Sequence, residues 1–307
     1  MPRTKLKNGA LIASLILMWG LSWPVQKVGL NYMPPLLFAG VRTVTGGFIL
    51  LLFALRRGRV LHWRRTWSIY LISAFLNVVL FFGLQTISLG ELPSGLVSVI
   101  VYLQPILVGV LAWLWLGEKL NLRKGIGLIL GFLGVVAVSL EGLSGHLAWS
   151  GFVYGLLAAV GWAVGTVYVK RVQNEVDLIW LVALQFLIGG AVTTGLGSLL
   201  NSWSLVHLTA TLWWSMAYSA AIGVALSWLV WMYLLRAGEA SRVAAATFFV
   251  PLLSVALGTW LLHEPLSIFL LLGLALMVVS IYLVNQNPWG KSKPDIHPVG
   301  TCHTPAE

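Results

Sequence analysis

The chain has 307 residues, of which 59% are hydrophobic and 9% are charged, and its mean hydropathy is +0.90. A soluble domain carries roughly 25% charged residues, so this composition excludes a soluble globular protein and indicates an integral membrane protein. The net charge of +10 does not predict nucleic-acid binding, because the basic residues are confined to short segments between apolar stretches.

Apolar stretches of membrane-spanning length follow one another along the chain. Because a hydrocarbon core about 30 Å thick needs about 20 apolar residues per helix, we predict an all-α integral membrane fold with ten transmembrane helices. The predicted spans are 9–30, 35–55, 67–88, 94–116, 123–140, 150–170, 178–199, 212–235, 242–262 and 267–285. The first span has no small-residue cleavage site, so we expect it to be retained and not removed as a signal peptide. We expect the polar, proline-rich segment 287–307 to be a disordered cytoplasmic tail.

The basic residues fall almost entirely in alternate loops. Their clusters lie at the N-terminus and at 56–65, 119–124, 170–171, 236–242 and 291–293. Cytoplasmic loops carry an excess of Lys and Arg. The pattern therefore predicts a multi-pass protein of the cell membrane with both termini in the cytoplasm.

Matched residues recur along the chain at a separation of 143 or 146 positions. The matched pairs are Trp19 and Trp162, Lys27 and Lys170, Arg42 and Gln185, Pro105 and Pro251, and Glu118 and Glu264. We infer a tandem duplication with one unit at 9–140 and the other at 150–285, each containing five helices. Because five is odd, the second unit would enter the bilayer from the opposite side, and such inverted repeats are typical of secondary transporters.

One segment of each unit follows the same order of features. In the first unit, Gly90-Glu91 is followed by a helix with Pro105 at its centre, by Glu118 and by a glycine-rich helix. The second unit repeats this order from Gly238-Glu239 through Pro251 to Glu264. The doubled pattern resembles the EamA domain of the drug/metabolite transporter superfamily. The resemblance implies a ten-helix transporter whose central cavity is lined by helices 1, 3, 4, 6, 8 and 9. It also implies cargo among amino acids, sugars, nucleotide sugars, drugs and other metabolites.

Polar and aromatic residues share one face of the first helix. Trp19, Ser22, Trp23 and Gln26 are spaced by three and four, so they lie on the same side. Such a face inside a lipid-embedded helix lines a cavity or packs against another helix, and we expect it to line the substrate site. The other residues that we predict to bind substrate are Asn77, Phe81, Gln85, Ser98, Tyr102, Trp162, Thr166 and Thr247.

The prediction for Asn77 carries an alternative. Asn77 lies near the middle of its span, where an unpaired amide is costly, so it either bonds a neighbouring helix or contacts substrate. In the eighth helix, we expect Ala225, Leu229 and Tyr233 to take the places that Asn77, Phe81 and Gln85 have in the third.

Arg42 is a charge inside the second predicted span. A charge at that depth costs several kcal/mol unless it is paired or faces water. One interpretation is a snorkelling or salt-bridged arginine that locks helix 2 to a neighbour, and the other is a contact for an anion or carboxylate. We favour the structural interpretation, because the family resemblance places helix 2 at the periphery.

Prolines and glutamates mark the fourth and ninth helices symmetrically. Pro105 and Pro251 interrupt their helices and favour a hinge for gating, although static curvature has the same signature. Glu118 and Glu264 end these helices, and we favour a capping or packing role over proton coupling.

These features predict a secondary transporter that exports small organic solutes by alternating access. The alternatives are a channel or a lipid scramblase. A membrane enzyme is a weaker alternative, because the spans contain almost no clustered Asp, Glu, His or Cys. We expect no cofactor, metal or enzyme activity. The expected partners are a small-molecule substrate, membrane lipid and, as a candidate coupling ion, a proton, in a monomer or homodimer.

Overall fold

The computed structural model describes residues 2–57, 61, 63–118, 121–139, 148–238 and 240–285. Every regular element in these ranges is a helix, so the predicted all-helical class is confirmed. The predicted tail 287–307 and the linker between the two predicted units lie outside the described residues.

Each span predicted from hydropathy is helical. The helices of the first half are α1 (Pro2–Gly29), α2 (Pro35–Arg56), the continuous run α3, η1 and α4 (Trp63–Ala74, Phe75–Gly83, Leu84–Glu91), α5 (Ser94–Val101), α6 (Gln104–Leu116) and α7 (Leu122–Ser139). Those of the second half are α8 (Trp149–Val172), α9 (Leu178–Leu200), the 3-10 turn η3 (Trp203–Leu205), the run α10, η4 and α11 (Ala210–Tyr218, Ser219–Leu226, Ser227–Ala237), α12 (Ala240–Ala246), α13 (Phe249–Leu262) and α14 (Ile268–Asn285).

Seven helices in the described residues are long and apolar enough to cross a bilayer, and two shorter apolar helices accompany them. The chain is therefore a multi-pass membrane protein. Large apolar side chains face outward around the bundle, as expected where lipid replaces water. Examples are Leu52 and Phe53 on α2, Trp213 on α10, and Leu272 and Tyr282 on α14.

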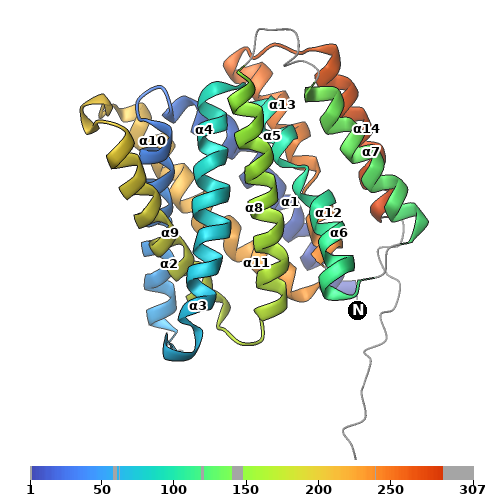
Figure 1. The fold of residues 1–307 in the computed structure, drawn as a ribbon, viewed down its shortest axis with the longest axis horizontal. Coiled ribbons are helices and arrows are strands. Elements are labelled where there is room, and N and C mark those ends of the chain that lie inside the picture. The colour runs from blue at the N-terminus through green and yellow to red at the C-terminus, as the bar shows by residue number, and fades with distance from the viewer. Residues whose placement is uncertain are drawn as a thin grey trace, which may run out of the picture.

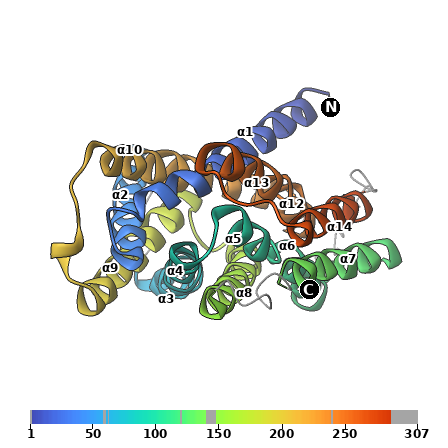
Figure 2. The same cartoon turned by 90° about the horizontal axis from the view of Figure 1, so that it is seen from above.

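Matched helix pairs lie at the two ends of the bundle. Helices α2 and α9 pack together at one end, and α7 and α14 pack together at the other (Figures 1 and 2). Between them, α1, α5, α8 and α13 form the middle of the molecule (Figure 2). The N-terminus and the C-terminal end of α14 lie toward the same side of the bundle (Figure 1).

A π-helical segment interrupts the long helix in each half, at η1 and at η4. Such segments are rare and often occur at functional sites. Both π-helical segments pack against glycines of α2 or α9, the pair of helices at one end of the bundle. A Cβ on Gly189 would lie 2.5 Å from Val78, and one on Gly46 would lie 2.5 Å from Val224. The two close approaches are equivalent, so Val224 occupies the place of Val78, 146 positions earlier.

This correspondence corrects one prediction. The equivalents of Asn77, Phe81 and Gln85 lie 146 positions later, at Gly223, Ser227 and Trp231. The sequence analysis placed them two residues further along, at Ala225, Leu229 and Tyr233. Because two residues rotate a helix by roughly 200°, this error pointed the wrong face of the eighth helix at the centre.

The fourth and ninth predicted helices are broken just before their prolines. Tyr102 and Leu103 form a turn between α5 and α6, and Thr247 and Phe248 do the same between α12 and α13. Pro105 lies in the first turn of α6, where its missing N–H costs nothing. At the second break the carbonyl of Thr247 accepts the N–H of Val250 at 2.9 Å.

Candidate functional site

A cavity lies at the centre of the bundle. The residues that line it are Trp19, Ser22, Trp23, Gln26, Arg42, Phe81, Phe82, Gln85, Tyr102, Trp162, Gly223 and Trp228. They come from α1, α2, the turn between α5 and α6, α8 and the two long helices that contain π-helical segments. The cavity has a volume of about 30 Å³, which is enough for roughly two water molecules. The cavity is therefore small in this conformation.

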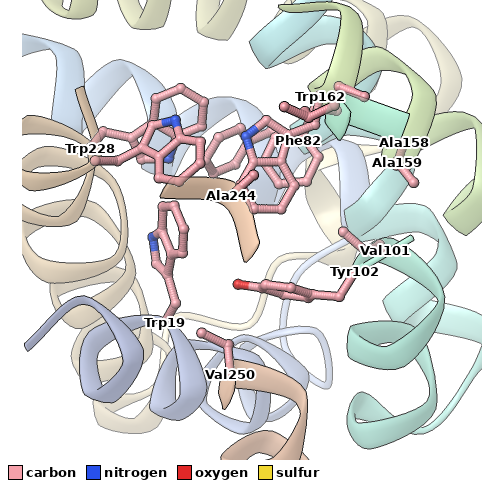
Figure 3. Packing of buried hydrophobic residues seen from close by; sticks show 14 of the residues in the cluster. Trp19, Phe82, Val101, Tyr102, Ala158, Ala159, Trp162, Trp228, Ala244 and Val250 are labelled. Carbon is pink, nitrogen blue, oxygen red and sulfur yellow. The ribbon is translucent and has the colours of Figure 1, made fainter. Parts of the chain in front are cut away.

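Aromatic rings form most of the wall. Trp19 contacts Trp162 edge-on with ring centroids 5.4 Å apart, and Phe81 stacks on Trp162 at 4.7 Å. Tyr102 meets Trp162 edge-on at 5.6 Å. Figure 3 shows Trp19, Tyr102 and Trp228 around one opening, with the Tyr102 hydroxyl on the side of Trp19. Such a wall suits a flat apolar body, which gains from stacking and edge-to-face contacts.

A line of polar groups runs along the other part of the wall. Gln26 donates to the Ser22 hydroxyl at 2.7 Å, and Gln85 donates to the Gln26 carbonyl oxygen at 3.1 Å. The Nη2 group of Arg42 in turn donates to Thr86 at 2.9 Å and approaches the Gln85 oxygen at 3.4 Å. One connected network therefore links α1, α2 and α4.

Arg42 joins α2 to the neighbouring α4, as the structural interpretation expects, but through neutral partners. Its side chain is fully buried, so it does not snorkel to an interface. In the described part of the chain its hydrogen-bond partners, Gln85 and Thr86, are both neutral, so it is not salt-bridged. Its Nε and Nη1 groups have no hydrogen-bond partner, and its Cζ lies 4.8 Å from the ring centroid of Phe82. Although α2 lies at one end of the bundle, this side chain reaches the central cavity.

Most of the predicted substrate-binding residues meet at this cavity. Those in the lining are Trp19, Ser22, Trp23, Gln26, Phe81, Gln85, Tyr102 and Trp162. Asn77 lies elsewhere, because its amide donates to Ser73 at 3.1 Å and to Gln185 at 3.4 Å. Ser73 also donates to Gln185 at 2.5 Å. This cluster ties the third predicted helix to α9, which is the helix-bonding alternative for Asn77.

Three further predicted residues lie outside the lining with their hydroxyls engaged. Ser98 and Thr247 donate to backbone carbonyls three residues earlier, of Gly95 and Ala244. Thr166 accepts the Gln104 amide at 3.2 Å and so joins α8 to α6. Hydroxyls satisfied in this way are available for packing between helices and less so for solute.

The sequence analysis missed Phe82, Gly223 and Trp228 as lining residues. The misplaced register of the eighth helix accounts for the last two. The 146-residue separation of the prolines and glutamates, applied to that helix, would have paired Gly223 with Asn77 and Trp228 with Phe82.

Lysines close both long helices in the same way. Lys27 donates to the carbonyls of Leu89 and Leu92 at 2.6 and 2.9 Å. Lys170 donates to those of Leu235 and Gly238 at 2.6 and 2.7 Å. The acceptors are again 146 positions apart. A cation at the last carbonyls of a helix stabilises its C-terminus.

Glutamates close the two broken helices, and each does so across the halves. Glu264 accepts the N–H groups of Ser94 and Gly95 at 2.6 and 3.0 Å and the Ser94 hydroxyl at 2.9 Å. Glu118 accepts the N–H of Ala240 at 2.8 Å and the hydroxyl of Ser241. A carboxylate at a helix N-terminus satisfies free N–H groups and the helix dipole. Each half therefore holds the start of a broken helix in the other.

These features define a class: a multi-pass membrane protein with a small polar and aromatic cavity buried among its helices. The model of the EamA-like transporter family matches residues 8–140 and again 149–286. The chain belongs to the EamA-like transporter family, and it is a membrane transporter.

Similar proteins cover nearly the whole chain. The uncharacterized transporter YvbV of Bacillus subtilis (strain 168) is 49% identical over 281 residues, which are 92% of each chain. A probable amino-acid metabolite efflux pump of Escherichia coli (strain K12) is 28% identical over 90% of this chain and 94% of its own. A solved crystal structure with 19% identity covers 91% of this chain and 96% of its own with a TM-score of 0.72, which supports the fold.

Proposed function

We propose that the protein is a secondary transporter that exports small organic solutes across the cell membrane by alternating access. The observation that carries the proposal is the central cavity, whose polar groups lie deep within an apolar bundle. Polar groups at that depth are costly unless they serve a pathway or a site.

The proposed architecture has ten membrane crossings arranged as two inverted five-helix units, at 9–140 and 150–285. The lysine and glutamate contacts support it, because Lys27 and Lys170 are 143 positions apart, Glu118 and Glu264 are 146 positions apart, and each pair bonds equivalent partners. In an inverted arrangement, the two glutamates cap helices at opposite membrane faces. A reporter fused at His146 and one fused at Lys170 should then lie in opposite compartments.

In the proposed cycle, the two faces open in turn around the cavity. Opening one face separates Glu264 from the start of α5, and opening the other separates Glu118 from the start of α12. The turns at Tyr102 and Thr247 give each broken helix a bending point next to its proline. Because only one glutamate contact needs to break at a time, the remaining one holds the opposite face shut.

The relative named as an amino-acid metabolite efflux pump supports an organic cargo and the export direction. No acidic residue lines the cavity among the described residues. We therefore place any coupling proton outside the cavity wall, and the gradient of the cargo itself can drive transport.

Counterflow in proteoliposomes tests this function. Vesicles are loaded with an unlabelled amino acid or aromatic carboxylate, and the entry of the same labelled compound is followed. A transporter shows saturable uptake that the internal compound stimulates, whereas a channel shows no such stimulation and a scramblase moves labelled lipid. Trp19→Ala should lose this uptake and Trp213→Ala should retain it, because Trp213 is 62% exposed on the outer surface. Uptake without internal stimulation for every compound would contradict the proposal.

A further inference from the structure

We propose that Arg42 forms a carboxylate-binding subsite in the central cavity, so that the cargo combines one carboxylate with a flat, apolar body. The inference rests on the proposed transport function and specifies its substrate class. It assigns Arg42 to the recognition of the cargo and not to the assembly of the helices.

The first observation is a surplus of hydrogen-bond donors in the cavity wall. The Nε–H of Arg42 and the N–H groups of its Nη1 have no partner, and neither does the indole N–H of Trp162. Both residues line the cavity. These are the buried atoms without a partner among the described lining residues, and all of them are donors. A ligand that satisfies them must present acceptor oxygens.

The second observation is the charge. Arg42 is the one charged residue in the described lining, and its partners Gln85 and Thr86 are neutral. Burying a charge beside neutral partners costs free energy, and the ring of Phe82 offsets part of that cost through a cation–π contact with Arg42. A single carboxylate would neutralise the guanidinium and accept several of its N–H groups. A phosphate dianion would leave a net negative charge, because no second cation lies in the lining.

The third observation is the difference between the halves. The position equivalent to Arg42 is Gln185, whose side-chain oxygen accepts from Ser73 and Asn77 and which is not among the lining residues of the central cavity. The position equivalent to Asn77 is Gly223, which lines the cavity. A Cβ on Gly223 would lie 2.8 Å from the Ser22 hydroxyl. Ser22 therefore packs directly against Gly223, just as Asn77 packs against Gly165 in the matched place, and the side chain of Ser22 stands in the lining where that of Asn77 does not.

The remaining wall sets the other part of the cargo. Trp19, Phe81, Tyr102 and Trp162 present rings around the same space. These rings favour contact with a flat apolar body. They offer no acidic partner for a cationic group on the cargo. The preferred class is therefore an aromatic or similarly flat monocarboxylate.

Matched acids and amides test the subsite directly. The purified full-length protein in detergent is titrated by calorimetry with 3-phenylpropionate and 3-phenylpropionamide, and with 1-naphthoate and 1-naphthamide. The acids should bind roughly tenfold to a hundredfold more tightly than the amides, as expected for charged hydrogen bonds. Equal binding of acid and amide in both pairs, or no binding of either pair, overturns the proposal.

Substitutions identify the residue responsible. Arg42→Gln should bind acid and amide equally, and Arg42→Lys should keep a reduced preference, because a lysine supplies the charge without the planar set of donors. The matched control is Arg56→Gln, which removes the same charge from an exposed position on the same helix and should bind as the wild type does. An unchanged preference in Arg42→Gln overturns the assignment.

Thermal unfolding separates recognition from a structural role. Arg42→Gln removes a buried charge without a counter-ion among the described residues, so it should melt at the wild-type temperature or above. A fall of several degrees would indicate that the arginine holds the helices together. Binding and counterflow also fail separately: preferred binding of the acids without counterflow contradicts the transport function and leaves the subsite in place. Counterflow that ignores the carboxylate contradicts the subsite alone.

Discussion

The two halves of the molecule share their helix-closing contacts and differ at the centre. Lys27 and Lys170 bond equivalent carbonyls, and Glu118 and Glu264 cap equivalent helix starts in the opposite half. At the centre, by contrast, most of the matched polar positions hold different side chains, although Trp19 and Trp162 are alike. The differing pairs are Ser22 and Gly165, Gln26 and Val169, Arg42 and Gln185, Asn77 and Gly223, and Gln85 and Trp231.

This comparison teaches that duplication preserved the framework and let the site become asymmetric. Repeated contacts suit two faces that open in the same manner, whereas a single cargo needs a single set of partners. The polar network that includes Arg42 lies within the first half, whereas Gln185, the match of Arg42, bonds Ser73 and Asn77 of the first half and so joins the two halves. Four sets of substitutions test this asymmetry.

Making the halves alike in charge should have the largest effect. Gln185→Arg would place a charge between Ser73 and Asn77 with no cavity beside it and no described carboxylate in contact. We expect a loss of at least about 3 kcal/mol in the free energy of unfolding. Size-exclusion profiles of the tagged protein and its melting temperature in detergent would show this as aggregation or early melting. Melting at the wild-type temperature would mean that the two positions are interchangeable.

Removing the Asn77 amide should lower the stability of the protein and leave its affinity for the cargo unchanged. Asn77→Ala leaves Ser73 and Gln185 without one shared partner, which should cost about 1–3 kcal/mol. The KM for counterflow should stay unchanged, because Asn77 does not line the cavity. Gln26→Ala is the matched comparison in the lining and should raise KM. A raised KM in Asn77→Ala with normal melting would return Asn77 to the site.

Neutralising the two glutamates should shift access in opposite directions. Glu264→Gln and Glu118→Gln each weaken charged hydrogen bonds to a helix start, by about 1 kcal/mol. In a Cys302→Ser background, a reporter Ser22→Cys is labelled by a membrane-impermeant thiol reagent from either side of oriented vesicles. One glutamine variant should raise labelling from one side and the other from the opposite side. Increases from the same side for both variants would refute paired gates.

Replacing the prolines should have the smallest effect. Pro105→Ala and Pro251→Ala each allow a regular helical hydrogen bond and so stiffen the bend beside them. We expect melting within about 1 kcal/mol of the wild type and a lower maximal rate of counterflow with an unchanged KM. Normal rates in both variants would assign the two breaks to static curvature.

Sequence reasoning located much of the site because its main signal was local. The face formed by Trp19, Ser22, Trp23 and Gln26 follows from helical spacing alone, and all four residues line the cavity. Thr247 was predicted to bind substrate, but its hydroxyl donates to the backbone carbonyl of Ala244. The sequence does not decide between such a bond and a contact with solute, since the choice depends on the side that the neighbouring residues leave open.

The membrane class, the helical spans and the recurrence of matched residues follow from the order of residues along the chain. These properties depend on composition and order along the chain, since lipid demands long apolar helices with internally bonded backbones. Only the tertiary structure decided that Arg42 reaches the centre, that Asn77 bonds Gln185, and that each glutamate caps a helix of the other half. Such contacts join residues more than a hundred positions apart or depend on how far one helix turns against another. No local pattern specifies that rotation, because the packing of many side chains fixes it together.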